Sequence, residues 1–194
     1  MKYANLNLGT IEATFNILGG IEGAARLRRG ELVLAEAQPK PEPAPEPPLD
    51  FLVRVDSSAK PSYPDWFKEL EHPELECSGP AEYDLQSGVE QWLHDDQKTG
   101  VVSGGTIYKR LKKDDALANQ LGLSDLLAIQ KMGIGVFRAL FKGKAVFGWK
   151  SVVRHRHGGL SAPYLCEDGD SVVVSWLWLH DGWDSSGPAL RFRK

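Results

Sequence analysis

The chain has 194 residues, of which 42% are hydrophobic and 25% are charged, and its formal net charge is −3. These are ordinary values for a folded globular protein, and they exclude a collagen-like repeat and a wholly disordered chain. Two cysteines, Cys77 and Cys166, are too few for the disulfide framework of a small secreted domain, and no apolar run approaches the roughly 20 residues that span a bilayer. The composition therefore predicts a cytoplasmic protein with free thiols and no membrane partner.

Residues 1–36 are predicted to form a small helical docking segment. Two short apolar stretches, residues 10–18 and 21–29, have the spacing of amphipathic helices and are separated by Gly19-Gly20. A piece of this size cannot bury a sufficient core of its own. We therefore expect this segment to dock on the rest of the chain, on a second copy or on a different protein.

Residues 37–50 are predicted to be a linker, because proline recurs there at almost every second position. Proline fixes φ and disfavours helix at the residue before it, so the stretch should be an extended, polyproline-like spacer. The alternative is a proline motif that a partner domain recognises. The remaining residues, 51–194, are predicted to form one α+β domain.

The first half of this domain is predicted to contain one strand and several short helices. Residues 51–55 indicate a strand, and residues 65–70 a short helix. Over residues 83–97 the apolar side chains are spaced along one face of a helix. Further helices are expected at residues 106–113, 124–131 and 134–141.

The second half of the domain is predicted to be mainly β-strand. From Lys144 onward, β-branched and aromatic residues dominate, and glycine lies at the joints between apolar runs. Short helices followed by a run of strands are typical of an α+β fold, in which an antiparallel β-meander is the simplest topology. The expected strands are residues 145–156, 160–166, 171–180 and 189–193.

Charge is segregated along the chain. Residues 31–100 carry 16 acidic and five basic groups, whereas residues 101–157 carry 11 basic and three acidic groups. A surface of one sign either meets an oppositely charged partner or is neutralised within the molecule. Clustered cations suit nucleic acid, because they displace counterions from phosphate backbones. The candidate nucleic-acid-binding residues are Lys109, Arg110, Lys112, Lys113, Lys142, Lys144, Lys150, Arg154 and Arg156.

The order of elements over residues 124–166 is that of a winged-helix DNA reader: helix, turn at Gly133, helix, hairpin. The second helix is mostly apolar, however, and offers few groups to base edges. The alternative is a solvated basic face, or one that pairs with the acidic residues of segment 65–96.

Three histidines are candidate metal ligands. His155 and His157 are two residues apart at the expected end of a strand, so their rings would point to the same side, and His180 could supply a third ligand. These residues make a small metal-dependent enzyme the alternative to a binding protein. Gly158-Gly159 follows at once, which is typical of an exposed hairpin tip instead.

Trp176 and Trp178 lie two residues apart on one expected strand and share a face of it. Such a face is either a wall of the core or an exposed surface on which bases, sugars or a partner could stack.

The segments Leu18-Gly19-Gly20-Ile21-Glu22-Gly23 and Arg28-Arg29-Gly30-Glu31 resemble the start of small uncharacterised bacterial proteins, which carry a GG-x-EG…RGE segment ahead of unrelated C-terminal parts. The resemblance implies no activity, cofactor or site, although a shared docking role would suit a segment common to different bodies. No pattern specifies a reaction, so catalytic residues are not assigned. The sequence therefore predicts a non-catalytic binding or adaptor protein without a cofactor, with a protein partner for residues 1–36 and nucleic acid as a second candidate partner.

Overall fold

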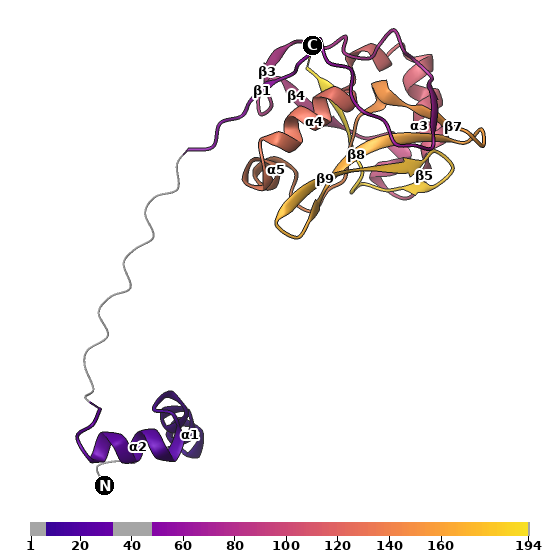
Figure 1. Cartoon of the computed structure of the whole chain (residues 1–194). Coiled ribbons are helices and arrows are strands. Elements are labelled where there is room, and N and C mark those ends of the chain that lie inside the picture. Colours follow the sequence, from indigo (N-terminus) through magenta and orange to yellow (C-terminus); the bar gives the residue numbers. More distant parts are fainter. Residues whose placement is uncertain (1–6, 33–47, 194) are drawn as a thin grey trace. The chain divides into compact units, whose positions relative to one another are not determined.

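The computed structural model describes residues 7–32 and 48–193 (Figure 1). The chain divides into two compact units, residues 1–47 and residues 48–194. The second unit is called the body. Residues 37–47 of the predicted spacer lie outside the described residues.

Within residues 7–32 the first unit contains two short helices, α1 (Leu8–Ile17) and α2 (Gly20–Arg28), as predicted. The chain turns sharply between them, because Gly19 and Gly20 have φ angles of +85° and +73°, which side chains other than glycine rarely adopt. Gly23 is buried against this turn, and a Cβ atom there would lie 1.5 Å from the Leu18 carbonyl oxygen.

The body is built on a seven-stranded sheet. Its strands are β2 (Phe67–Leu70), β4 (Val89–Trp92), β6 (Val146–Phe147), β7 (Val153–His155), β8 (Leu160–Asp168), β9 (Ser171–Trp178) and β11 (Ala189–Phe192). In space the order is β2, β7, β8, β6, β11, β4, with β9 paired to β8. Two small sheets join β1 (Leu52–Arg54) to β3 (Glu82–Asp84), and β5 (Val102–Ser103) to β10 (Gly182–Trp183).

The α+β class is confirmed, but the sheet is not a simple antiparallel meander. β8 and β9 form the expected hairpin, whereas β11 runs parallel to β6, with Ala189 opposite Phe147. The reason is the segment between β9 and β11, whose strand β10 pairs with β5 before the chain returns. β11 thereby lies between β6 and β4 and pairs antiparallel with β4.

Three α-helices of the body were predicted correctly. α3 (Gly104–Lys113) is capped by the Ser103 hydroxyl, which accepts a hydrogen bond from the Thr106 N–H group. α4 (Leu123–Lys131) and α5 (Ile134–Phe141) are separated by Gly133, whose φ angle is +87°. No helix among the described residues is long and apolar enough to cross a membrane.

Two other helix predictions are wrong. Residues 67–70 form strand β2, which pairs with β7, and residues 83–97 form parts of β3 and β4 and the start of a 3₁₀ turn, η1 (Asp95–Lys98). A tight turn separates β3 from β4, because the Asp84 carboxylate accepts the Ser87 N–H group. The expected strand 145–156 is likewise interrupted, by the 3₁₀ turn η3 (Trp149–Ser151).

The sheet carries buried side chains on both faces. Successive residues of a strand point to opposite sides, so Val146 and Phe147 belong to different core clusters. One cluster packs α4 and α5 against the sheet through Ile129 and Phe137, and the other packs α3 against it through Leu111. The helices are therefore held by opposite faces of one sheet, and Figure 1 shows α3 at the far end of the body from α5.

Candidate binding surfaces

The nine candidate cations do not form one surface. Four of them lie on α3 between Lys109 and Lys113, whereas Lys142 and Lys144 follow α5 at the other end of the body (Figure 1). Lys150 lies in η3 and is only 2% exposed, so it is not available at the surface, where a contact with nucleic acid would require it. Any ligand of the whole set would have to wrap around the domain.

Several of these cations are paired within the chain. The Arg154 guanidinium lies 2.7 Å from the Glu71 carboxylate and 3.5 Å from that of Glu69. Arg110 is paired with Asp114 within one helical turn. The acidic segment 65–96 therefore does meet part of the basic segment inside the molecule.

The remaining exposed cations are few. Lys109, Lys112 and Lys113 on α3 are exposed and take part in no ion pair among the described residues, although the Lys112 ammonium lies 4.3 Å above the Tyr108 ring. Burial raises the pKa of Tyr108 to about 12, so the phenol stays neutral beneath this cation. Arg156 is exposed at the β7–β8 turn.

Lys150 belongs to a buried polar network that joins η3 to the start of α4. Burial lowers the pKa of its ammonium group, and burial raises the pKa of the nearby Asp125 carboxyl, which is 5% exposed. One Asp125 oxygen accepts the Gly122 N–H group at 2.8 Å, and the Tyr83 hydroxyl donates to the other at 3.3 Å. Asp125 thereby satisfies the N–H group of Gly122, the N-cap residue of α4.

Ser151 makes the second connection in this network. Its hydroxyl accepts the Leu123 N–H group at 2.7 Å and donates to the Glu76 carboxylate at 2.6 Å. Glu76 also accepts the Tyr63 hydroxyl at 2.8 Å. Because these groups satisfy one another and bind the Gly122 and Leu123 N–H groups at the start of α4, the network serves the fold, and we assign it no ligand.

The three candidate metal ligands are not brought together. The His155 ring is 7% exposed and lies between the rings of Trp66 and Trp178, at centroid distances of 3.9 and 3.8 Å, with Nε2 2.9 Å from the Ser161 hydroxyl. His157 is exposed in the turn beyond, and His180 is paired with Asp181 on the surface. Nowhere in residues 7–32 and 48–193 do three His, Cys, Asp or Glu side chains gather as a metal site would require.

Trp176 and Trp178 extend this stack into a half-buried aromatic row. The Trp176 ring meets Trp66 edge-on at 5.4 Å, and Tyr63 lies 6.1 Å from it. The row is neither a closed core wall nor a free stacking face, because residues 63–67 cover one side of it. The sequence could not show this, since the loop that supplies Tyr63 and Trp66 lies about a hundred residues upstream of β9.

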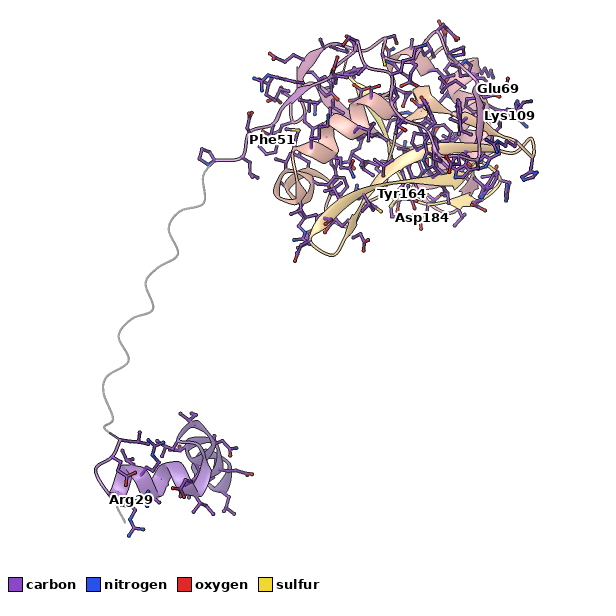
Figure 2. All side chains as sticks on the ribbon, viewed as in Figure 1. Arg29, Phe51, Glu69, Lys109, Tyr164 and Asp184 are labelled. Carbon is purple, nitrogen blue, oxygen red and sulfur yellow. The ribbon has the colours of Figure 1, made fainter. Side chains whose placement is uncertain are left out.

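The helices of the first unit expose a large part of their apolar surface. Leu8, Ile17 and Ile21 are 84–85% exposed, and Ile11 and Phe15 are 43% and 41% exposed. Figure 2 shows the side chains of α1 and α2 projecting around the two helices. Several charged groups at the end of α2 are paired locally, as Arg29 is with Glu31 at 2.6 Å.

No protein-family model, no curated protein and no solved structure matches the chain. The resemblance of the N-terminal segment to bacterial proteins therefore stays a prediction.

Proposed function

We propose that the chain is a non-catalytic binding protein of the adaptor class, in which α1 and α2 dock on a partner protein. The observation that carries the proposal is the exposure of five large apolar side chains on two short helices: Leu8, Ile11, Phe15, Ile17 and Ile21. Scattered exposed apolar residues are normal on a protein surface, but a concentration of this kind marks an interaction site.

The spacing of these residues indicates how the partner binds. Leu8, Ile11 and Phe15 stand at positions i, i+3 and i+7 of α1, which places them along one side of the helix. Helices with anchors at this spacing bind by laying their apolar side into a groove of the partner. Burial of three such side chains contributes roughly 5–9 kcal/mol before the costs of association. The partner is therefore a protein with an apolar groove.

Charge contributes little to this contact. The Arg29 guanidinium is bonded to Glu31, and Glu22 is within 3.5 Å of it, so these groups neutralise one another inside the unit. Binding through α1 should accordingly change little with ionic strength, unlike an electrostatic contact.

The test compares three full-length proteins: the natural chain, Phe15→Lys, and Val101→Lys as a control at an apolar residue of the body that is 70% exposed. A partner captured with the natural chain is identified, purified and titrated against all three by calorimetry. We expect the control to bind like the natural chain and Phe15→Lys to bind at least about 30-fold more weakly, since a buried aromatic anchor is worth 2 kcal/mol or more.

Two results would contradict the proposal. One is a purified partner that binds Phe15→Lys as tightly as the natural chain. The other is a concentration-dependent dimer, detected by light scattering, that Phe15→Lys abolishes, because the apolar side of α1 would then belong to a second copy of this chain.

Nucleic acid is a second candidate ligand, and the exposed lysines of α3 are the observation that favours it. Lys109, Lys112 and Lys113 occupy one short helix and remain outside the ion pairs described above. Phosphate backbones attract such a cluster without requiring base contacts. This contact is confined to α3, in place of the wider face from residue 109 to 156.

A further inference from the structure

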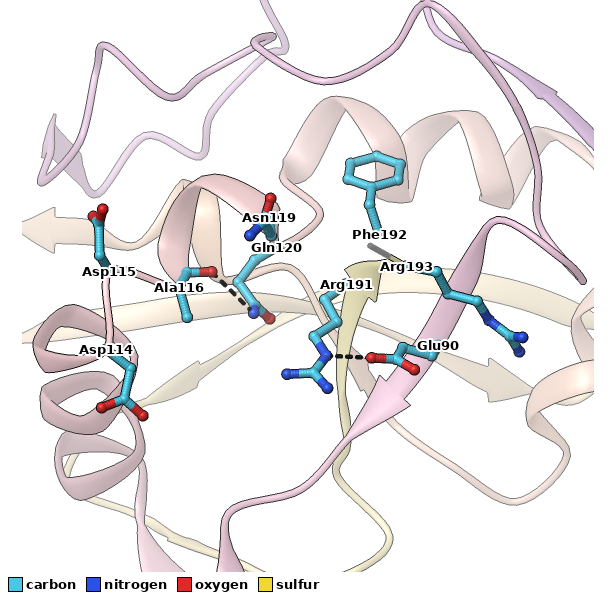
Figure 3. A pocket seen from close by; sticks show the side chains of 9 residues that line it. All are labelled: Glu90, Asp114, Asp115, Ala116, Asn119, Gln120, Arg191, Phe192 and Arg193. Atoms are coloured by element: carbon cyan, nitrogen blue, oxygen red, sulfur yellow. Dashed lines mark hydrogen bonds and ion pairs between the residues drawn. The ribbon is translucent and has the colours of Figure 1, made fainter.

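A cavity of about 440 Å³ opens in the body between the end of α3 and the paired strands β4 and β11. It is called the Gln120 pocket here, after the residue between its two sides. Figure 3 shows Asp114 and Asp115 on one side, Arg191 and Glu90 on the other, and the Gln120 side chain between them. The volume is within the range of small-molecule sites, about 300–1,000 Å³.

Gln120 carries a buried acceptor that lacks a donor. The residue is 0% exposed, and its amide N–H group donates to the Ala116 carbonyl oxygen at 3.2 Å. That carbonyl can only accept, so it fixes which end of the amide carries the nitrogen. The other end, Oε1, is buried and finds no hydrogen-bond partner among the described residues. An orphaned buried acceptor is costly and rare. Oε1 has almost no accessible surface, so a donor in the pocket can reach it only after a small shift of the Gln120 side chain.

The acidic side of the pocket has one carboxylate, that of Asp115, that is not used in an ion pair among the described residues. Asp114 is paired with Arg110, which leaves Asp115 without an ion pair among the described residues. The end of α3 adds to the negative potential there, since the last carbonyl groups of a helix carry partial negative charge. This side of the pocket favours a cationic group.

Asp115 also occupies a backbone position where glycine is the usual residue. Its φ angle is +50°, and the N–H groups of Asp115 and Ala116 bond to the carbonyls of Lys112 and Leu111, which is the Schellman ending of a helix. A side chain in this conformation costs about 1 kcal/mol or more. The chain therefore carries a carboxylate at this point although the turn itself would favour glycine.

The opposite side of the pocket presents a guanidinium group. Arg191 faces Glu90 across the β4–β11 ladder, and its Nε donates to the Glu90 carboxylate at 2.6 Å. The Trp92 ring, 6.0 Å away, supports the same group. The terminal nitrogens of Arg191 make no further hydrogen bond among the described residues, and Figure 3 shows one of them directed toward the space in front of Gln120. A planar fork of this kind matches a carboxylate.

From these three features we propose that the Gln120 pocket binds a small zwitterion of the free amino-acid class. The ammonium group lies between Asp115 and the Gln120 carbonyl oxygen, and the carboxylate lies on Arg191. The ligand supplies the hydrogen-bond donor that Gln120 lacks, and its two charged groups are opposite in sign to Asp115 and Arg191. This inference goes beyond the docking role of α1, which uses none of these residues.

The experiment starts with the full-length chain and the proteinogenic L-amino acids, screened by their effect on thermal unfolding. The best of them is then titrated by calorimetry beside two analogues with the same side chain, the amine that lacks the carboxylate and the acid that lacks the ammonium group. We expect each analogue to bind at least about tenfold more weakly, because it forfeits one charge-assisted contact.

The variants Asp115→Asn and Arg191→Gln should each lower the affinity at least about tenfold for the same reason. Asparagine tolerates the left-handed conformation, and Asp115→Gly relieves it, so neither change at residue 115 should lower the unfolding temperature. Asp170→Asn, which removes an exposed carboxylate from the β8–β9 turn, is the matched control and should bind normally. Phe15→Lys should also bind normally, which separates this test from that of the docking role.

The proposal is overturned if no L-amino acid binds with a dissociation constant of about 10 mM or lower. It is equally overturned if the amine or the acid alone binds as tightly as the zwitterion, or if Asp115→Asn and Arg191→Gln both bind like the natural chain.

Discussion

His155 shows how a single residue acquires its behaviour from its surroundings. The ring is stacked between the indoles of Trp66 and Trp178 and is hydrogen-bonded to the Ser161 hydroxyl, so aromatic side chains shield it from solvent. Burial lowers the pKa of His155 below its ordinary value of 6.5, and the neighbouring His157 lowers it further when charged. A histidine in such a site is neutral in the folded protein at physiological pH.

This environment predicts a pH dependence of stability. Between the folded pKa and 6.5 the unfolded state binds more protons at this residue than the folded state, so the free energy of unfolding falls as the pH falls through that window. His155→Phe keeps an aromatic ring between Trp66 and Trp178 but cannot titrate, and it should lose this part of the decline. Urea unfolding of both proteins between about pH 5 and 8 measures the difference. If the free energies of unfolding of the two proteins change with pH in parallel, the folded state does not disfavour protonation of His155, and the prediction is wrong.

At the scale of the elements, α3 is the candidate contact for nucleic acid. Three exposed lysines can neutralise about three phosphates, so the logarithm of affinity for duplex DNA should fall with the logarithm of salt at a slope no steeper than about −3. Changing Lys109, Lys112 and Lys113 to Gln should abolish this binding, whereas the control changes Lys142→Gln and Lys144→Gln should not. Fluorescence anisotropy over a range of salt measures both.

A slope near −8 would instead require nearly all nine candidate cations, and it would contradict their separation in the structure. The absence of binding at the lowest salt would remove nucleic acid as a candidate ligand.

The same scale shows what the sequence could predict. α3, α4, α5, β8 and β9 followed from hydrophobic period, β-branched residues and glycine positions, which are local signals. Residues 83–97 were assigned to a helix because their apolar spacing fits one, yet Val89 pairs with Phe192, about a hundred residues later. Such pairing is decided by tertiary packing and leaves no local signal.

The candidate sites obey the same rule. Lys150 is recognisable as a cation, but the sequence shows neither its burial nor its interaction with the carboxylates of Asp125 and Glu76, which come from other segments. The Gln120 pocket could not have been found, because Arg191 and Asp115 stand far apart in the sequence and neither belongs to a motif. Chemistry can be read from residue types, whereas location depends on contacts between distant segments.

At the scale of the whole body, the segregation of charge along the chain is partly cancelled in space. The acidic segment 65–96 supplies Glu69 and Glu71 to Arg154, and it supplies Glu90 to Arg191. These ion pairs join segments that are far apart in the sequence, so they act on the tertiary structure and not within one helix or strand. Their contribution to stability is nevertheless modest, because partly exposed pairs are weakened by solvent and salt.

A double-mutant cycle on Arg154→Gln and Glu71→Gln measures how far the two segments neutralise each other. The side chains are 32% and 20% exposed, so the coupling free energy of unfolding should be about 0.5–1 kcal/mol at low salt and should shrink in about 1 M salt. The pair Arg110 and Asp114, which is more exposed and lies at the end of α3, is the control and should couple more weakly. If Arg154 and Glu71 do not couple, their ion pair does not stabilise the fold. Both charges would then be available to an external partner, and the acidic and basic segments would not neutralise each other at this place.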